Sequence, residues 1–123
     1  MHNVFVYGTL LKGERNDFLL KNATCIAEHC TTLGELYDTG YGYPAIKLSN
    51  EARVYGELYQ VSDDELIELD RLEGYTDGAS DNLYERVIQS VETGAGTTTA
   101  FVYVAASENL LNERIVSGDW RVK

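Results

Sequence analysis

Short runs of β-branched and aromatic residues recur along the chain, and glycine or other turn-forming residues close each of them. Such runs are typical of short strands in a sheet. They are Val4–Tyr7, Cys25–Asp38 with a break at Gly34, Ala45–Leu48, Arg53–Val61, Leu83–Val91 and Thr98–Ala105. Helical composition is confined to two segments, whereas a doubly wound α/β fold needs more helical crossovers. The pattern predicts an α+β domain built on a small curled or closed mixed β-barrel with two short helices.

The best-defined strand pair lies in the second half of the chain. Leu83–Val91 alternates two sets of side chains, as a strand with two different faces does, and Thr98–Ala105 is rich in β-branched and aromatic residues. Gly94-Ala95-Gly96 stands between them and has turn chemistry. These segments predict an antiparallel hairpin.

The two helical segments differ in how clearly their ends are marked. The first follows Gly13 and covers Glu14–Asn22. The second starts with the capping box Ser62-Asp63-Asp64-Glu65 and continues as the amphipathic run Leu66–Glu73. Gly74 is expected to end this helix at the C′ position, where a left-handed backbone is favoured.

Glu73 stands in the last turn of the second helix, where a carboxylate faces the negative end of the helix dipole at a cost of about 0.3–1 kcal/mol. It follows Leu69 by four residues and Leu66 by seven, so it lies on the stripe that faces the core. Burial and the dipole both raise the pKa of a carboxyl, and a Glu with a pKa of roughly 6–7 can exchange a proton near neutral pH. Glu73 is therefore a candidate general base. The alternative is a frayed helix end with the carboxylate in solvent.

The first strand ends at Gly8, and the polar loop that follows is a second candidate site. Because glycine has no side chain, we expect Gly8 to adopt a backbone conformation that only glycine reaches easily and to turn the next N–H groups toward a ligand. Such a loop can hold an anion or an oxyanion. The alternative is that Gly8 simply ends a strand in a turn.

Other chemistries that use a glycine turn do not fit this loop. The spacing of Gly8 and Gly13 is that of a phosphate-binding loop, but Glu14-Arg15 stands where Lys and Ser/Thr would close the motif. A dinucleotide fingerprint needs a glycine where Leu10 stands. The chain also has no Gly-x-Ser-x-Gly elbow, which argues against a serine hydrolase.

The two cysteines, Cys25 and Cys30, do not form a recognisable metal or catalytic motif. No second pair of ligands follows them at zinc-site spacing, so no metal is expected. His29 and Cys30 are neighbours in a strand, and their side chains would point to opposite faces rather than form a dyad. In a cytosolic protein both thiols are expected to be reduced.

Charge limits the partners that this chain can bind. Ten Lys and Arg face twenty Asp and Glu, which gives a net charge of −10. Nucleic acids and anionic membranes are therefore not expected as partners, since both need concentrated positive charge. A substrate carboxylate would have to be held by local N–H donors or a single placed arginine.

The length of 123 residues predicts one domain covering residues 1–123, with a core of ordinary size. No apolar run is as long as a membrane span, and the start of the chain lacks the basic and small-residue features of a signal peptide, so we expect a cytosolic protein. The nine tyrosines are expected to pack mainly in the barrel core with their hydroxyls at its rim.

Five segments, taken together and in this order, resemble the gamma-glutamylcyclotransferase-like family, which includes the gamma-glutamylamine cyclotransferases. They are Val6-Tyr7-Gly8-Thr9-Leu10, Gly42-Tyr43-Pro44-Ala45, Leu69-Asp70-Arg71-Leu72-Glu73-Gly74-Tyr75, Leu83-Tyr84-Glu85-Arg86-Val87 and Ser117-Gly118-Asp119-Trp120. The resemblance spans nearly the whole chain and implies a small barrel-like α+β fold.

The resemblance also implies roles for individual residues. Tyr7, Gly8, Thr9 and Leu10 would hold the glutamyl group, Glu73 would be the catalytic acid/base, and Tyr84 would border the same cavity. The implied reaction is cofactor-free cyclisation of a small gamma-glutamyl amine or amide to 5-oxoproline. The loop has a Tyr-Gly-Thr-Leu form rather than Tyr-Gly-Ser-Asn, which favours amines or amides over free dipeptides. A non-catalytic module that binds an amino-acid-like ligand in the same cavity is the alternative, and the leaving amine and oligomeric state stay open.

Overall fold

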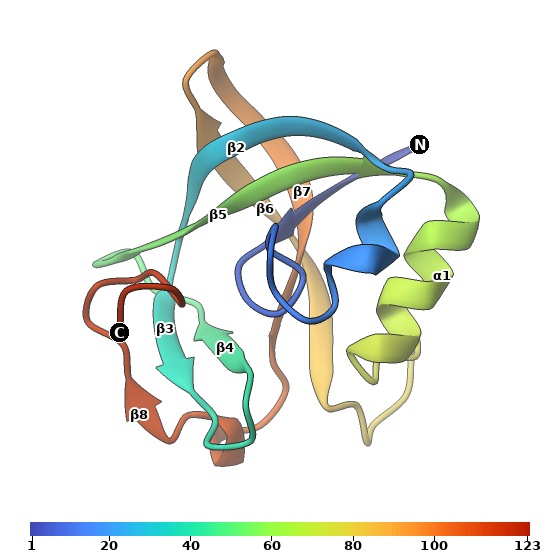
Figure 1. Cartoon of the computed structure of the whole chain (residues 1–123). Helices are drawn as coiled ribbons and strands as arrows, with labels where there is room; N and C mark the ends of the chain where they lie inside the picture. The colour runs from blue at the N-terminus through green and yellow to red at the C-terminus, as the bar shows by residue number, and fades with distance from the viewer.

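The computed structural model describes residues 1–123 and contains a closed five-stranded barrel with a smaller sheet beside it (Figure 1). The strands are β1 (His2–Val6), β2 (Thr24–Leu33), β3 (Glu35–Asp38), β4 (Pro44–Lys47), β5 (Arg53–Val61), β6 (Tyr84–Thr93), β7 (Gly96–Ala105) and β8 (Glu113–Arg114). The helical elements are the α-helix α1 (Asp63–Leu72) and the 3-10 turns η1 (Asp17–Leu20) and η2 (Glu108–Leu110). The predicted α+β fold on a closed mixed barrel is confirmed.

The barrel strands follow one another in the order β1-β5-β2-β6-β7. Neighbouring strands are antiparallel except where β1 pairs with β7, a parallel contact through Val4 and Phe101 that closes the barrel. Closure leaves these five strands without a free edge. It also brings the end of β1 close to β7, although most of the sequence separates them.

The predicted hairpin is confirmed as β6 and β7. Their register is continuous from the pair Tyr84 and Ala105 to the pair Thr93 and Gly96. The hairpin extends beyond the rest of the barrel in Figure 1, whereas its other end reaches the region below α1. Tyr84 and Tyr103 therefore lie at the end of the hairpin that faces the helix.

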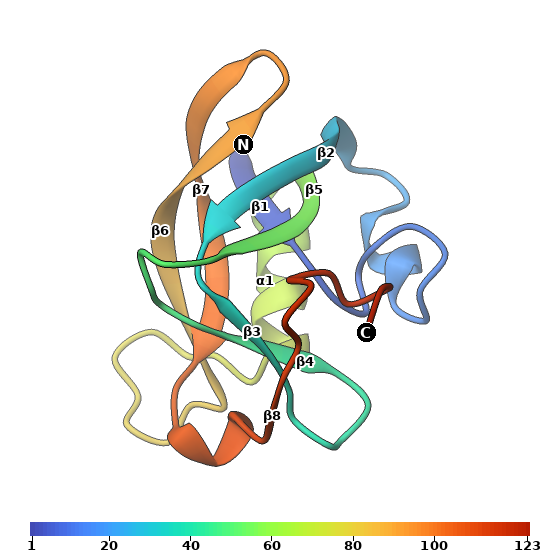
Figure 2. The same cartoon turned by 90° about the vertical axis from the view of Figure 1, so that its left-hand side faces the viewer.

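The smaller sheet has the order β4-β3-β8 and includes a strand that the sequence pattern did not predict. The sequence of residues 107–123 is mostly polar and predicted no strand. In the structure, however, β8 pairs with Tyr37 and Asp38 of β3, and Ile115 and Trp120 are buried. In Figure 2 the C-terminal segment passes the small sheet and ends beside the loop that follows β1. The chain terminus thus braces the first loop.

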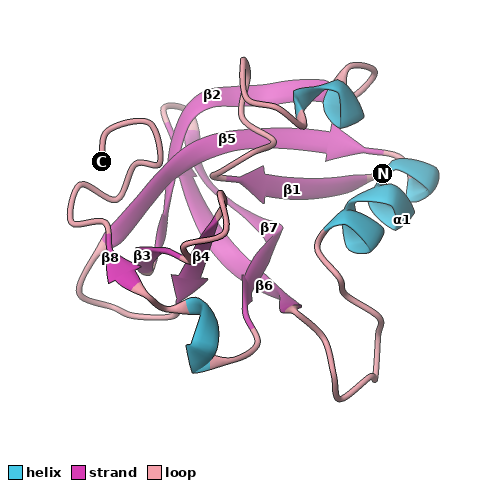
Figure 3. Ribbon diagram, turned by 60° about the horizontal axis from the view of Figure 1, so that its bottom comes forward, coloured by secondary structure: helices cyan, strands magenta, loops and turns pink.

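The core fills the barrel and the space under α1. Its fully buried side chains include Val4, Phe5, Leu36, Ile46, Val54, Leu58, Val61, Leu69, Val91 and Val102. Leu66 and Leu69 are the buried residues of α1 and fix the helix on the barrel, as the apolar stripe predicted. Figure 3 shows that α1 is joined to β6 by a long connection without regular structure.

The first expected helix is present only as the 3-10 turn η1. Leu20 is its one buried residue, so little apolar surface favours a longer helix. Local hydrogen bonds also compete with helix formation, because the Gly13 N–H donates to Asp17 Oδ2 at 3.0 Å and the Asn16 N–H donates to the Thr9 carbonyl at 2.9 Å. No helix of the protein is long and apolar enough to cross a membrane.

Candidate active site

The loop after β1 is a tight turn with three free backbone donors. The Leu11 N–H donates to the Gly8 carbonyl at 3.1 Å, and Asn16 donates from Nδ2 to Thr9 Oγ1 at 2.9 Å. In contrast, the N–H groups of Gly8, Thr9 and Leu10 have no acceptor within the protein. Buried N–H groups are normally paired, so consecutive free donors form a ready site for an anionic oxygen.

Gly8 is required by packing rather than by its backbone angles. Its φ is not positive, so the expectation of a conformation reserved for glycine is wrong. A Cβ at this position would lie 2.6 Å from both Cγ and Cδ of Pro44. Only a residue without a side chain allows the loop to approach Pro44 this closely.

A buried carboxylate fixes the far end of the same loop. Glu57 is 3% exposed, and its Oε1 accepts from the Lys12 N–H at 3.0 Å and from the Tyr59 hydroxyl at 2.9 Å. Arg121 donates to Glu57 Oε2 at 3.4 Å and also to the Lys12 carbonyl. These bonds hold the loop between β5 and the C-terminal segment.

Glu73 is placed by a helix whose two ends are both capped as predicted. Ser62 and Glu65 form the reciprocal capping box at the start of α1. At its end the Gly74 N–H donates to Arg71 O at 3.3 Å, the Tyr75 N–H donates to Asp70 O at 2.9 Å, and Gly74 has a φ of 64°. This is a Schellman motif, in which Glu73 is the C-cap residue.

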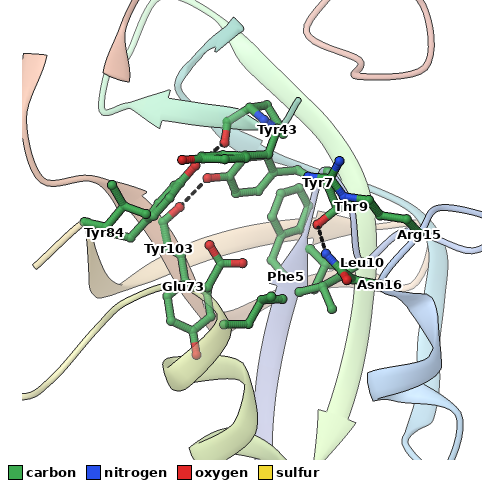
Figure 4. A pocket seen from close by; sticks show the side chains of 15 residues that line it. Phe5, Tyr7, Thr9, Leu10, Arg15, Asn16, Tyr43, Glu73, Tyr84 and Tyr103 are labelled. Carbon is green, nitrogen blue, oxygen red and sulfur yellow. Dashed lines mark hydrogen bonds between the residues drawn. The ribbon is translucent and has the colours of Figure 1, made fainter. Parts of the chain in front are cut away.

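The Glu73 carboxyl lies in the cavity and does not fray into solvent. The residue is half-buried, and burial raises the pKa of its carboxyl to about 7. Burial is the one cause of this shift, and no hydrogen bond or ion pair with another side chain contributes to it. Figure 4 shows the carboxyl pointing toward Tyr7 and Tyr84. A carboxyl with this pKa and no partner is available to take and return a proton.

One cavity of about 260 Å³ brings the predicted site residues together. All six that the sequence singled out line it: Tyr7, Gly8, Thr9, Leu10, Glu73 and Tyr84. The remaining lining residues are Phe5, Val6, Arg15, Asn16, Tyr43, Pro44, Leu72, Leu83 and Tyr103. The free loop donors and the carboxyl therefore belong to a single pocket, which is largely apolar apart from them.

Tyrosines form the wall opposite Glu73. The Tyr7 hydroxyl donates to the Tyr103 carbonyl at 2.5 Å, and the Tyr84 hydroxyl donates to the Pro44 carbonyl at 2.5 Å. Burial raises the pKa of both phenols well above the usual range, so they stay neutral. The Tyr43 ring lies 6.2 Å from the Tyr84 ring and extends this wall toward the surface. These tyrosines thus contribute to a cavity as well as to the core.

Several lining residues could not be assigned from the sequence. Arg15 and Asn16 come from the segment expected to be helical, and Tyr43 comes from a predicted turn. Tyr103 occupies an ordinary position of the hairpin strand. Glu57, which holds the loop without lining the cavity, had a usable sequence signal, because it is a charged residue between the strand residues Val54 and Leu58.

The cysteines lie apart from this cavity. Cys30 is buried beside Gly56, to whose carbonyl its thiol donates at 3.3 Å, and burial raises the pKa of the thiol to about 12. Such a thiol is a poor nucleophile. No three side chains of His, Cys, Asp or Glu are grouped closely enough to hold a metal ion.

The geometry is that of an enzyme site suited to proton transfer on a small substrate. A carboxyl whose pKa is near neutrality and a loop with unpaired N–H groups line the same small, mostly apolar cavity, an arrangement that suits general acid–base catalysis.

Comparison with known proteins identifies the family. The family described as gamma-glutamyl cyclotransferase, AIG2-like, matches residues 4–122, and the chain belongs to it and is a cyclotransferase enzyme. A gamma-L-glutamyl-butirosin B gamma-glutamyl cyclotransferase from Niallia circulans is 39% identical over 122 residues, covering 98% of this chain and 76% of the relative.

Solved structures show the same fold. YkqA from Bacillus subtilis has a TM-score of 0.78 and 32% identity over 98% of this chain and 39% of its own. An AIG2-like protein from Mus musculus has a TM-score of 0.71 and 29% identity, covering 86% of this chain and 78% of its own. The likeness thus extends from the sequence to the arrangement of the barrel.

Proposed function

We propose that this enzyme cyclises a gamma-glutamyl amine or amide to 5-oxoproline and releases the free amine, without a cofactor. The observation that carries the proposal is Glu73: a carboxyl with a pKa of about 7 and no protein partner, in the same cavity as the free N–H groups of the first loop. Cyclisation of a gamma-glutamyl group needs a proton acceptor and an oxygen-binding site of this kind.

In the proposed reaction the α-nitrogen of the glutamyl group forms a bond with its own γ-carbonyl carbon, and the bond from that carbon to the leaving nitrogen breaks. Glu73 takes the proton that the α-ammonium must lose before it can attack. The protonated Glu73 returns this proton to the leaving nitrogen. The attacking nitrogen loses a second proton as the ring amide forms, and this proton goes to the released amine, which departs as an ammonium, so the carboxylate is regenerated and no water is consumed. Because both reacting groups belong to one molecule, the cavity acts largely by holding them in the reactive conformation.

The N–H groups of Gly8, Thr9 and Leu10 serve as the anchor for the glutamyl group in this proposal. They hold either its α-carboxylate or the γ-oxygen that becomes negative during attack, and loss of one such donor costs about 3–4 kcal/mol of transition-state stabilisation in other enzymes. Arg15 is the only cationic residue that lines the cavity and adds positive charge on this side. The tyrosine hydroxyls on the opposite wall stay neutral, so the carboxyl of Glu73 is the one acidic group that lines the cavity.

The size of the cavity supports a substrate whose glutamyl part binds inside it and whose amine part stays outside. About 260 Å³ is at the small end for ligand sites, and it suits a glutamyl unit better than a whole conjugate. We place the leaving amine toward the mouth, next to Tyr43. Similarity to a cyclotransferase named for gamma-L-glutamyl-butirosin B supports a gamma-glutamyl amide or amine as the substrate.

The test is direct detection of products. The purified protein is incubated with a panel of gamma-glutamyl amides that differ only in the amine, and 5-oxoproline and the amine are measured together by mass spectrometry. We expect equal amounts of both from at least one substrate, and none from α-glutamyl amides, whose α-nitrogen cannot reach the amide carbonyl to close a five-membered ring. Release of glutamate in place of 5-oxoproline would contradict the proposal, because it would mean hydrolysis by water.

A further inference from the structure

Asp70 lies one helical turn before Glu73, and both of its carboxylate oxygens and its backbone carbonyl accept hydrogen bonds from groups outside the helix. Its Oδ1 accepts from the Tyr103 hydroxyl at 2.6 Å, and its Oδ2 accepts from Arg86 Nη1 at 2.5 Å. Its backbone carbonyl accepts from the Tyr75 N–H in the helix cap. The Asp70 and Arg86 side chains are 21% and 18% exposed, so this ion pair is shielded far better than a surface pair.

Arg86 is itself held on two sides. Its guanidinium carbon lies 4.5 Å from the centre of the Phe101 ring on β7 and 5.0 Å from the centre of the Tyr75 ring just after α1. Cation–π contacts of this kind fix a guanidinium whose other side is used for hydrogen bonding. The Asp70–Arg86 pair therefore ties the end of α1 to both strands of the β6–β7 hairpin.

This network continues into the wall of the cavity. Tyr103 donates its hydroxyl to Asp70, lines the cavity, and accepts at its backbone carbonyl from the Tyr7 hydroxyl. Glu73 has no partner of its own, so its place in the cavity depends on where the last turn of α1 is held. The contacts of Asp70 provide the polar link between that turn and the opposite wall.

We propose that Asp70 and Arg86 are positioning residues for the cyclisation, which as a charge-neutral pair hold Glu73 at the cavity without placing a net charge beside it. This inference rests on the proposed function. Neither residue lines the cavity, and both act through Glu73.

Because the Asp70–Arg86 pair is neutral, removing the charge of one member changes the pKa of Glu73 as well as its position. If Arg86 stood alone, its positive charge would stabilise the Glu73 carboxylate and lower its pKa, which would weaken the base. If Asp70 stood alone, its negative charge would raise that pKa. The other groups near Glu73 are the neutral hydroxyls of Tyr7, Tyr84 and Tyr103, Arg15 on the cavity wall, and the exposed pair Glu68–Arg71 on α1.

The experiment compares Asp70→Asn, Arg86→Gln and the double variant. Two quantities are measured: the midpoint of the acid limb of kcat/KM, and the pKa of Glu73 from NMR titration of its labelled carboxyl carbon without substrate. We expect Asp70→Asn to lower both by on the order of half a unit, Arg86→Gln to raise both by a similar amount, and the double variant to return close to the wild type. We also expect each single variant to lower kcat roughly tenfold with a smaller change in KM.

Glu68→Gln with Arg71→Gln is the matched control, since this pair lies on the same helix at 2.7 Å but is exposed. We expect it to leave the pKa of Glu73 and kcat unchanged. Shifts of the Glu73 pKa in the same direction in the two single variants, or a double variant whose Glu73 pKa stays as far from the wild-type value as in a single variant, would overturn the proposal.

Tyr103→Phe keeps the proposal testable if a charge variant does not fold. It removes one hydrogen bond to Asp70 and changes no charge, so we expect kcat to fall several-fold while the pKa of Glu73 stays in place. An unchanged kcat would count against positioning through Asp70. The NMR titration needs no substrate, so it judges this inference even if no 5-oxoproline is formed and the proposed function fails.

Discussion

Replacing Gly8 with alanine tests the close packing of the first loop against Pro44. The added Cβ would lie 2.6 Å from Cγ and Cδ of Pro44, whereas carbon atoms normally rest about 3.5–4.0 Å apart. Either the loop or Pro44 must therefore move by about 1 Å. Both line the cavity, and the Pro44 carbonyl also accepts from the Tyr84 hydroxyl, so a shift of either one changes the position of the loop N–H groups relative to Glu73.

The size of the effect follows from this displacement. Overpacking of this kind typically costs about 1–3 kcal/mol of folding free energy, which for a chain of this length lowers Tm by roughly 3–15 °C. Misplacing a substrate-binding group by about 1 Å can cost roughly 100-fold in rate. We therefore expect Gly8→Ala to fold, to melt earlier, and to lose about two orders of magnitude in kcat/KM.

The assay measures kcat/KM and thermal unfolding for Gly8→Ala, Pro44→Ala and the double variant. Thr9→Ser is the matched control in the same loop, since it keeps both the N–H and the hydroxyl that accepts from Asn16, and it should be nearly neutral. If the clash with Pro44 is the cause, removing Cγ and Cδ in the double variant should recover part of the loss. A double variant no better than Gly8→Ala would refute this reasoning, as would a fully active Gly8→Ala.

Glu57→Gln should destabilise the protein by about 1–3 kcal/mol and raise KM, because one oxygen that holds Lys12 or Arg121 becomes an N–H₂ donor; urea unfolding and steady-state kinetics check this. Tyr84→Phe leaves the Pro44 carbonyl without its donor and should lower kcat/KM several-fold, with a fall in Tm. Because folding raises the pKa of Glu73 to about 7, the contribution of this group to stability is present below about pH 4.5 and is lost as the pH rises to 7. The Tm of Glu73→Gln should therefore rise relative to that of the wild type across this interval. A Tm difference that stays constant from pH 4 to 8 would contradict the shift.

The features that the sequence predicted well depend on residues close together in the chain. Ser62 and Glu65 form their capping box within one turn, and Gly74 ends α1 two residues after its last helical residue. The β6–β7 hairpin needs only its alternation and a short glycine turn. In each case the deciding interactions are local, so a sequence window contains all the information that they need.

What could not be predicted depends on contacts between distant segments. Pro44 approaches Gly8 across the first loop, and the Tyr7 hydroxyl reaches the carbonyl of Tyr103, 96 residues away. The strand β8 forms only because β3 offers it a free edge. These contacts follow from closure of the barrel, and no local pattern records them.

The position of Glu73 is intermediate between these cases. Its place on the apolar stripe and beside the helix end predicted a buried carboxyl with a raised pKa. The sequence could not show that the carboxyl has no partner, nor that Asp70 and Arg86 fix the turn that bears it. Those facts depend on where β6 and β7 pass.

The most direct test of the account is the pH dependence of kcat/KM for a gamma-glutamyl amide, measured from pH 5 to 9 in the wild type and in Glu73→Gln, with chemistry shown to limit the rate. The account predicts an acid limb with its midpoint near 7, below which the rate falls about tenfold per pH unit, since only ionised Glu73 accepts the proton. Glu73→Gln should lose roughly 100- to 10,000-fold and keep only the limb that belongs to the substrate amine. A wild-type limb centred near the ordinary value of about 4.3, or a Glu73→Gln variant with wild-type kcat/KM, would contradict the central claim.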